Sequence, residues 1–250
     1  MRKQSILFVG ESWLVNNLEV KGFDHFYMGG YGNGIKYIKE ALSAKFDFSH
    51  MPAHEVPERF PVAMEELGKF DVLLVSDVGA NSFLLHPDTF YGYRRTPNRL
   101  DLIAEYVRRG GGFGMIGGYM TYMGIEGKGF YKDTIIEEVL PVTLLSRDDR
   151  VEVPQGIQIA IEPDIHPILE GLPGKWPELF GYNRLAAKAG STVIASYGED
   201  PIITLGQYGE GRTLAYATDC APHWSPPQFC EWEYYPVLWQ RLIHWLLKEI

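Results

Sequence analysis

Short apolar runs recur along the first half of the chain, and each one is followed by small or acidic residues. The runs are Ile6–Val9, Val72–Val75 and Phe113–Ile116. They lack the alternation of apolar and polar residues that marks a strand with one face in water. Uninterrupted apolar runs of this length are typical of strands buried on both faces of a parallel sheet. The pattern therefore predicts a parallel sheet at the centre of the fold.

Helical periodicity separates these runs. Apolar residues recur at three- and four-residue spacing in Tyr31–Ala44 and Arg99–Arg109, as in a helix with one buried face. Pro97-Asn98 is a start signal for the second helix, and Gly110 is a stop signal. Because strands alternate with helices, right-handed crossovers are expected. We predict a flavodoxin-like α/β fold with a doubly wound, mainly parallel sheet.

The pattern changes after about residue 145, where short β-like segments follow one another. Arg150–Val153 and Gly156–Ile161 are predicted to pair, and Pro201–Leu205 and Arg212–Thr218 to form a hairpin across a glycine-rich turn. Further β structure is expected at Ala186–Lys188 and Thr192–Tyr197, and an amphipathic helix over about Tyr234–Lys248. We find no linker, repeat or low-complexity segment. We predict one domain, residues 1–250, with a β-rich portion at about 146–210.

The predicted sheet indicates where a ligand would bind. Ligands of open α/β sheets lie at the carboxyl ends of the parallel strands, near the point where the strand order reverses. Four segments follow such strand ends and are expected to meet at one crevice. Their candidate ligand-binding residues are Glu11, Ser12, Asp77, Gly79, Asn81, Gly117, Gly118, Tyr119 and Asp219, and the candidate catalytic residues are His223 and Cys220.

Composition excludes several functions. The net charge of -9 and the lack of a basic stripe argue against a nucleic-acid surface. We expect no membrane insertion, because no apolar run approaches the about 20 residues that span a bilayer. No signal segment is evident, and two cysteines are too few for a disulfide framework, so we expect a cytoplasmic protein. The histidines share no ligand spacing, and neither a metal nor a cofactor is expected.

Each candidate residue also has a structural interpretation. Cys220 is either a nucleophile paired with His223 or a small buried hydrophobe. His223 either contacts a ligand or pins the turn at Pro222. Asp77 and Glu11 either face a ligand or shape the turn after a strand, and Ser12 either contacts a ligand or caps a helix. The sequence leaves these alternatives open.

The glycine-rich segment Gly110–Thr121 is the most informative stretch. It resembles a strand–turn–helix elbow, which in α/β enzymes raises a nucleophile above the carboxyl edge of the sheet. Its apex holds Gly117, Gly118 and Tyr119, where a Cys or Ser would be expected. These glycines either let a ligand approach backbone N–H groups or only ease a tight turn.

Several motifs resemble the class I glutamine amidotransferase-like superfamily, in particular its divergent, trehalose-utilisation-like branches. They are Leu73–Asp77, Tyr106–Phe113, Gly209–Asp219 and the segment from His223 to Trp245, and the resemblance covers most of the chain. It implies that Gly118 or an immediate neighbour stands where these enzymes have their cysteine. Val78-Gly79-Ala80 stands where they have oxyanion donors. His223 lies near their late histidine, but Ser225 replaces the expected glutamate. We therefore expect no glutamine hydrolysis, which requires an activated thiolate and its base.

Two further segments combine aromatic residues with glycine, Gly22–Gly34 and Tyr91–Arg95. Such segments stack on sugar rings, cover a pocket or form subunit contacts, and we favour a homo-oligomer contact.

The leading hypothesis is a cytoplasmic protein that binds a small, carbohydrate-related molecule without glutaminase activity. One alternative is a hydrolase that uses His223 with Asp77 or Glu11. Another is a structural, oligomer-forming protein.

Overall fold

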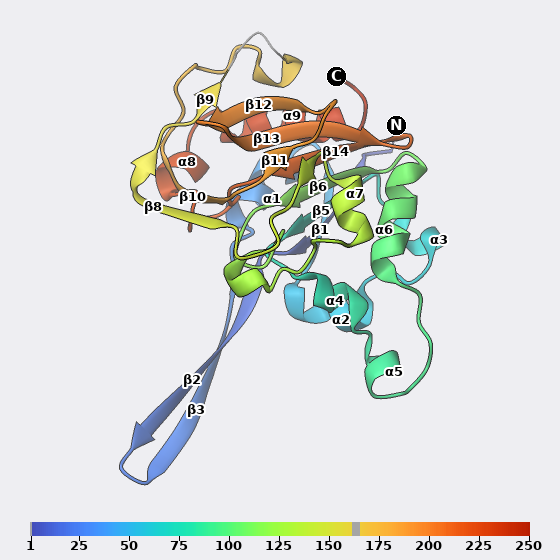
Figure 1. Ribbon diagram of the computed structural model, residues 1–250, viewed down its shortest axis with the longest axis vertical. Helices are drawn as coiled ribbons and strands as arrows, with labels where there is room; N and C mark the ends of the chain where they lie inside the picture. Colours follow the sequence, from blue (N-terminus) through green and yellow to red (C-terminus); the bar gives the residue numbers. More distant parts are fainter. Residues whose placement is uncertain (1, 162–165) are drawn as a thin grey trace.

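An eight-stranded mixed sheet forms the centre of the computed structural model, which describes residues 2–161 and 166–250 (Figure 1). The strand order is β4-β1-β5-β6-β14-β13-β12-β9, and the first five strands are mutually parallel. The bounds of these eight strands are β4 Asp47–Met51, β1 Ser5–Gly10, β5 Val72–Ser76, β6 Gly112–Ile116, β14 Gly211–Tyr216, β13 Asp200–Tyr208, β12 Thr192–Tyr197 and β9 Ala160–Ile161. The fold is therefore the predicted mainly parallel α/β sheet, extended by antiparallel strands near the C-terminus.

Helices cover both faces of this sheet. On one face α1 (Lys36–Ser43) packs against α9 (Tyr235–Leu246), and on the other α6 (Arg99–Arg108) packs against α7 (Ile135–Val139) and α4 (Ala80–Leu84). The shorter helices are α2 Val56–Arg59, α3 Met64–Leu67, α5 Pro87–Phe90 and α8 Pro227–Cys230, with 3-10 turns η1 Ala53–Glu55, η2 Ile125–Gly127 and η4 Pro167–Leu169. No helix in the described part of the chain is long and apolar enough to cross a membrane.

The three predicted core strands, the hairpin and the closing helix are confirmed. Strands β1, β5 and β6 are buried along their whole length, because helices cover them from both sides. The hairpin consists of β13 and β14, which pair from Ile203↔Tyr216 to Tyr208↔Gly211. Asn98 caps α6 by accepting a hydrogen bond from the Leu100 N–H, as the start signal predicted.

Other predicted elements differ from the structure. The helix predicted over Tyr31–Ala44 begins only at Lys36, because residues 31–33 belong to strand β3 (Asp24–Asn33). Arg150–Val153 does not pair with Gly156–Ile161. Instead one strand, β8 (Arg150–Ile157), pairs with β10 (Leu179–Asn183), and β9 joins the edge of the main sheet. A second small pair joins β11 (Ala186–Ala187) to β7 (Val142–Thr143).

The first strand is followed by an element that the sequence analysis missed. β2 (Ser12–Lys21) and β3 form a long two-stranded ribbon that projects from the body of the molecule (Figure 1). The chain then returns through α1 to β4 at the sheet edge, and passes from β4 to β5 on the other side of β1. The direction of winding therefore reverses between β1 and β5, where α/β sheets bind their ligands.

Candidate functional site

A cavity of about 260 Å³ lies at this reversal point, at the carboxyl ends of the parallel strands. It draws residues from the ends of β1, β5, β6 and β14, so the four predicted segments do meet. Its lining residues are Glu11, Trp13, Gly34, Asp77, Tyr119, Asp219, Ala221, Pro222 and His223. Of the predicted candidates, five line this pocket: Glu11, Asp77, Tyr119, Asp219 and His223.

Two of the carboxyl groups follow their strands directly and have unusual backbone conformations. Glu11 and Asp77 both have φ near 49°, in the left-handed region of the backbone that residues other than glycine rarely adopt. The Glu11 N–H donates to the Ser76 carbonyl at 2.8 Å, and its Oε2 accepts from the Ser76 hydroxyl at 2.7 Å. Strained residues of this kind persist where the surrounding structure holds them, and they cluster at functional sites.

The pocket holds three carboxyl groups that burial keeps from ionising readily. Burial raises the pKa of Glu11 well above its usual range, and the charges of Asp219 and Asp77 raise it further. The pKa of Asp219 is likewise raised by burial and by Asp77. Burial also raises the pKa of Asp77, although a hydrogen bond of 2.7 Å from the Met120 N–H opposes the shift. Raised pKa values favour the protonated form, and a carboxyl group donates a hydrogen bond when protonated and accepts when ionised.

An imidazole completes this group. His223 Nδ1 lies 3.4 Å from Asp219 Oδ2. The ring stands edge-on to Tyr119, with centroids 4.5 Å apart, and stacks on Trp224 at 5.2 Å. Arg150 in turn lies over the Tyr119 ring, 4.9 Å from its centroid. Aromatic packing thus holds the imidazole beside a carboxyl group of raised pKa, an arrangement suited to general acid–base chemistry.

The glycine turn after β6 lies behind Asp77 and is not an open elbow. The expected strand–turn–helix form is wrong, because turns follow Ile116 as far as η2. The Gly118 N–H donates to Asn183 Oδ1 at 3.0 Å, and the Gly117 N–H donates to the Tyr216 carbonyl at 2.7 Å. A Cβ at position 118 would lie 2.9 Å from Asp77 Oδ1. Glycine is therefore needed here so that the Asp77 carboxylate fits against the backbone.

Three predicted residues contribute to the surroundings of the pocket and not to its lining. Ser12 begins strand β2 and is not the N-cap of a helix; its Oγ accepts a hydrogen bond of 2.8 Å from the Ala53 N–H. Gly79 precedes α4, and Asn81 is an exposed residue on that helix. The Ala80 N–H donates to the Gly129 carbonyl at 2.8 Å and is already engaged.

Cys220 is fully buried and does not line the pocket, so its proposed nucleophilic role finds no support in the geometry. Its Sγ lies 3.8 Å from Ser76 Oγ and 3.9 Å from Glu11 Oε2. Burial and the charges of Glu11 and Asp219 raise its pKa well above the usual range, which keeps the thiol protonated. The partner of His223 is Asp219 and not this thiol.

Within residues 2–161 and 166–250, Glu11, Asp219 and Cys220 form a group that could hold a metal ion, because one ligand-type atom of each lies within 4.8 Å of the others. Zinc accepts such ligands, and all three side chains are buried. The expectation of no metal remains a prediction.

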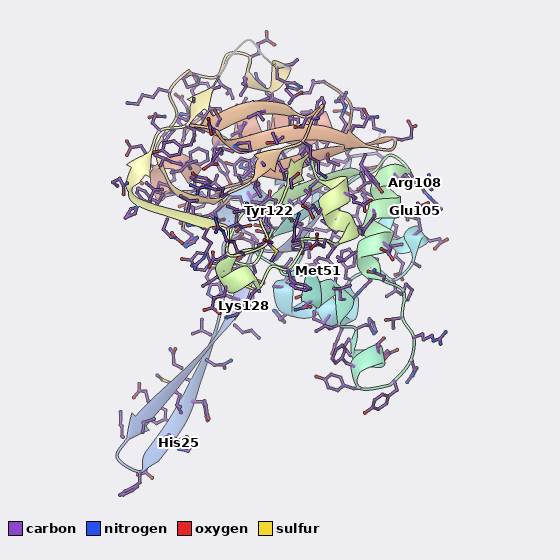
Figure 2. The ribbon with its side chains drawn as sticks, in the orientation of Figure 1. His25, Met51, Glu105, Arg108, Tyr122 and Lys128 are labelled. Carbon is purple, nitrogen blue, oxygen red and sulfur yellow. The ribbon has the colours of Figure 1, made fainter. Side chains whose placement is uncertain are left out.

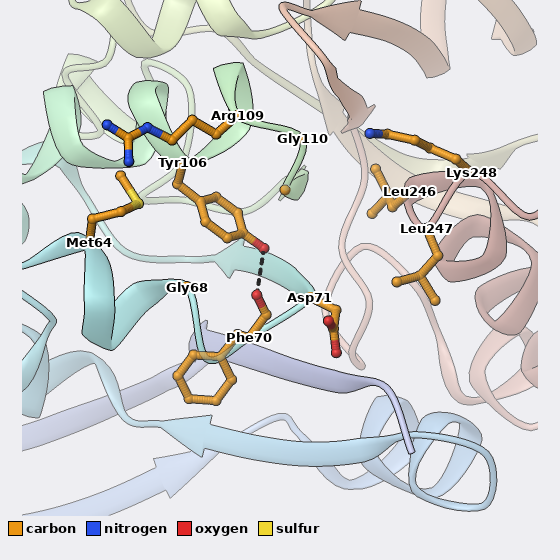
Figure 3. Close-up of a pocket in the computed structure, with 11 residues that line it drawn as sticks. Met64, Gly68, Phe70, Asp71, Tyr106, Arg109, Gly110, Leu246, Leu247 and Lys248 are labelled. Carbon is orange, nitrogen blue, oxygen red and sulfur yellow. Dashed lines mark hydrogen bonds between the residues drawn. The ribbon is translucent and has the colours of Figure 1, made fainter. Parts of the chain in front are cut away.

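A larger cavity of about 420 Å³ lies at the opposite, amino end of the strands (Figure 3). Two of its polar side chains are paired: the Tyr106 hydroxyl donates to the Phe70 carbonyl at 3.2 Å, and Asp71 forms an ion pair of 2.9 Å with Arg2. Arg109, also in its lining, pairs with Glu105 at 2.6 Å. This cavity lies away from the strand ends that form functional sites in such sheets.

Sequence reasoning missed Asn183 and Asp149, which hold the glycine turn from behind. Asn183 Nδ2 donates to Asp149 Oδ1 at 2.7 Å, and the same carboxylate accepts from the N–H groups of Met123 and Gly124 at 2.8 and 2.9 Å. Trp13 belongs to one of the segments expected at the crevice and lines the pocket, but it was not among the candidate ligand-binding residues. Its position two residues after Glu11 could have identified it as a residue of the site.

The fold is that of a class I glutamine amidotransferase-like protein. The chain belongs to the family described as "Putative glutamine amidotransferase", whose model matches residues 5–248. The finer assignment to a trehalose-utilisation-like branch remains a prediction. No curated protein matches the chain.

Two solved structures are similar to this chain over nearly their whole length. Cytoplasmic protein STM1381 from Salmonella typhimurium is 44% identical, with a TM-score of 0.92 over 97% of this chain and 99% of that one. Cytoplasmic protein STM3548 from Salmonella typhimurium is 41% identical, with a TM-score of 0.92 over 97% and 98%. Their names agree with the cytoplasmic location expected from the sequence. A β-galactosidase from Rahnella, 15% identical with a TM-score of 0.53, shares the fold over 85% of this chain and 26% of its own.

Proposed function

We propose that the pocket at the carboxyl edge of the sheet binds a small polyhydroxylated molecule of carbohydrate type, and that the protein does not hydrolyse glutamine. The carrying observation is the combination of three carboxyl groups with the aromatic side chains of Trp13 and Tyr119 in one pocket. Its volume of about 260 Å³ lies just below the about 300 Å³ at which drug-sized sites begin. A single sugar ring is the kind of ligand that fits.

The carboxyl groups match hydroxyl groups better than they match a cation. Burial raises the pKa of Glu11 and of Asp219, which favours the protonated form of each carboxyl group. A mixture of protonated and ionised carboxyl groups offers both donors and acceptors, and each hydroxyl of a sugar is itself a donor and an acceptor. Aromatic rings supply the flat apolar surface that the C–H face of a sugar covers.

The negative part of the proposal rests on three contacts. Gly118 stands where the family resemblance places the nucleophile, and its N–H is already donated to Asn183. The Ala80 N–H, in the segment expected to supply oxyanion donors, is donated to Gly129. The thiol of Cys220 is buried beneath the pocket. Without an accessible thiolate, a thioester intermediate lacks its nucleophile.

Isothermal titration against a panel of monosaccharides and linear polyols tests the binding proposal. We expect at least one sugar to bind, and Trp13→Ala and Asp77→Asn each to weaken it by about tenfold, the loss of about 1.4 kcal/mol. Tyr93→Ala is the matched control, because Tyr93 is 92% exposed and lies outside the pocket. The proposal fails if no polyol binds, if the control weakens binding equally, or if the protein releases ammonia from glutamine.

Hydrolysis by general acid–base catalysis is the second candidate function. It is favoured by the contact between His223 and Asp219 and by the raised pKa of Glu11, since a general acid must hold its proton near neutrality. Chromogenic glycosides provide the assay. Under this candidate, His223→Gln abolishes turnover while sugar binding persists. Binding without turnover in the unmodified protein contradicts this candidate and leaves the binding proposal intact.

A further inference from the structure

We call the ribbon of β2 and β3, Ser12–Asn33, the arm. Its strands pair without a break from Ser12↔Asn33 to Lys21↔Asp24. It extends well beyond the body of the molecule, and His25 lies near its far end (Figures 1 and 2). Within the described residues, β2 and β3 pair only with each other, so the outer edge of each strand remains unpaired.

Both faces of the arm carry large apolar side chains. Residues directly opposite each other in an antiparallel pair point to the same face. One face therefore presents Trp13, Val15, Phe26 and Met28, and the other presents Leu14, Leu18, Val20, Tyr27 and Tyr31, with Phe23 in the turn. All ten are exposed, from 39% for Val15 to complete exposure of Phe23.

Such a surface is not stable in isolation. A lone two-stranded hairpin is marginally stable in water, and contiguous apolar patches on soluble proteins mark interaction sites. A fully exposed aromatic side chain has an area of about 150–250 Å², and an aliphatic one has less. Scaled by their exposed fractions, the ten side chains together expose on the order of 1,000 Å². That area exceeds the about 800 Å² that each partner contributes to a specific interface.

The charge of the arm favours a second copy of this chain as the partner. The arm carries Glu19, Asp24 and Lys21 as its formal charges, one negative charge in excess, while the whole chain carries -9. Two copies of so acidic a protein repel each other over most of their surfaces. Electrostatic repulsion is weakest where a nearly neutral, apolar surface forms the contact. The 97% coverage of the Salmonella structures leaves out about eight of 250 residues, so these matches include part of the 22-residue arm.

We propose that the arm is the contact surface of a homo-oligomer, in which the arm of one copy packs against a second copy of this chain. Burial of both arm faces removes the apolar side chains from water, and the unpaired strand edges are available for pairing with the partner. Trp13 belongs both to the base of the arm and to the pocket lining. The oligomer contact therefore extends towards the mouth of the pocket.

A shortened arm tests the proposal. Asn16 and Gly29 are directly opposite each other, so deletion of Asn17–Met28 joins them as an Asn-Gly pair, the preferred centre of a two-residue hairpin turn. The deletion retains Trp13 and the pocket. In sedimentation equilibrium at micromolar concentration, we expect the full chain to have at least twice the 28.4 kDa of one chain. The shortened variant is expected to be a monomer.

Point substitutions supply a matched comparison. Leu18→Glu with Tyr27→Lys replaces a cross-strand apolar pair by an ion pair that preserves the ribbon, and is expected to yield monomers. Leu85→Glu with Tyr197→Lys makes the same chemical changes at exposed positions of the body, and is expected to leave the oligomer intact. A monomeric full chain, or an oligomer that survives both arm variants, overturns the proposal. Sugar binding is measured separately and does not decide this test.

Discussion

Glu11 and Asp77 are strained in their backbone and buried in their side chains, a combination that lowers the stability of the folded protein. A residue held in a sparsely populated backbone region costs about 1–3 kcal/mol. Burial of an ionised carboxyl group adds to that cost unless hydrogen bonds offset it. Both features occur at one pocket. A protein without these two carboxyl groups would be more stable, but it would lack the groups that the proposed ligand contacts.

Glu11→Gln is expected to raise the free energy of unfolding at pH 7 by roughly 0.5–2 kcal/mol, the range for relief of a destabilised functional site. Burial raises the pKa of Glu11 in the folded state, so the folded state binds its proton more tightly than the unfolded state does. The penalty is absent below the ordinary pKa of 4.5 and grows as the pH rises from there towards the folded value. The gain in the free energy of unfolding from Glu11→Gln should therefore vanish near pH 4.

Urea denaturation at both pH values measures this difference. Glu126→Gln is the control, because Glu126 is exposed and Lys128 holds its pKa below the usual range. That control should give no gain at pH 7. A Glu11→Gln variant that is less stable than the parent at pH 7 would contradict the proposed cost of burying this carboxyl group.

Gly118→Cys is expected to leave glutamine hydrolysis absent, even though it places a thiol where the family resemblance expects one. The new Cβ would lie 2.9 Å from Asp77 Oδ1, and the Gly118 N–H is already donated to Asn183. An oxyanion would therefore find no free donor in this turn. Ammonia release from glutamine is the measurement, and Gly118→Ala controls for the steric effect alone. Measurable turnover in the cysteine variant would show that the turn retains a working oxyanion hole.

At the scale of elements, the pocket depends on strands that come from the β-rich part of the chain. Asn183, at the end of β10, bonds the N–H and the carbonyl of Gly118 and also the Asp149 carboxylate. A second link of this kind is Arg99, at the start of α6, whose buried guanidinium donates to the carbonyls of Val56, Pro57, Ser82 and Phe83. Side chains thus join elements whose backbones do not pair.

Asn183→Ala is expected to lower the free energy of unfolding by about 2–3 kcal/mol, because it leaves several buried polar groups without partners. It should also weaken ligand binding, since the glycine turn supports Asp77. Chemical denaturation and titration with the bound sugar measure the two effects. Asn81→Ala, at an exposed position on α4, is the control and should change neither. A fully stable Asn183→Ala variant would show that the turn does not depend on this side chain.

At the scale of the whole molecule, the arm and the body are different kinds of structure. The body surrounds one continuous core, whereas the arm contributes apolar side chains that no described part of the same chain covers. An arm of this shape contributes little to the stability of a single copy. It contributes to the stability of an assembly, because association favours the folded form by mass action.

The melting temperature of the full chain is therefore expected to rise with protein concentration, and that of the variant lacking Asn17–Met28 is expected to stay constant. Differential scanning calorimetry over a hundredfold concentration range measures the difference. The Leu85→Glu, Tyr197→Lys variant should behave like the full chain. Equal, concentration-independent melting of the full chain and the shortened variant would indicate that the arm does not mediate association.

The arm also shows where sequence reasoning failed. Its residues were interpreted as an aromatic, glycine-rich segment and the beginning of a helix, because alternation of apolar and polar residues is confined to Leu18–Lys21. That alternation arises only when one face of a sheet is buried in its own domain. Here both faces are apolar, and glycines stand opposite Trp13 and Val15. The prediction of a subunit contact rested on composition and remains a proposal.

By itself, the sequence determined the buried strands β1, β5 and β6, the helix α6, the β13–β14 hairpin and the meeting of four strand ends. Local periodicity and the rules of parallel sheets suffice for these features. Only the tertiary structure decided which polar groups remain available. It engages the Gly118 amide with Asn183, buries Cys220 beneath Glu11, and places His223 beside Asp219. Burial and hydrogen-bond partners come from residues distant in sequence, so no local pattern contains them.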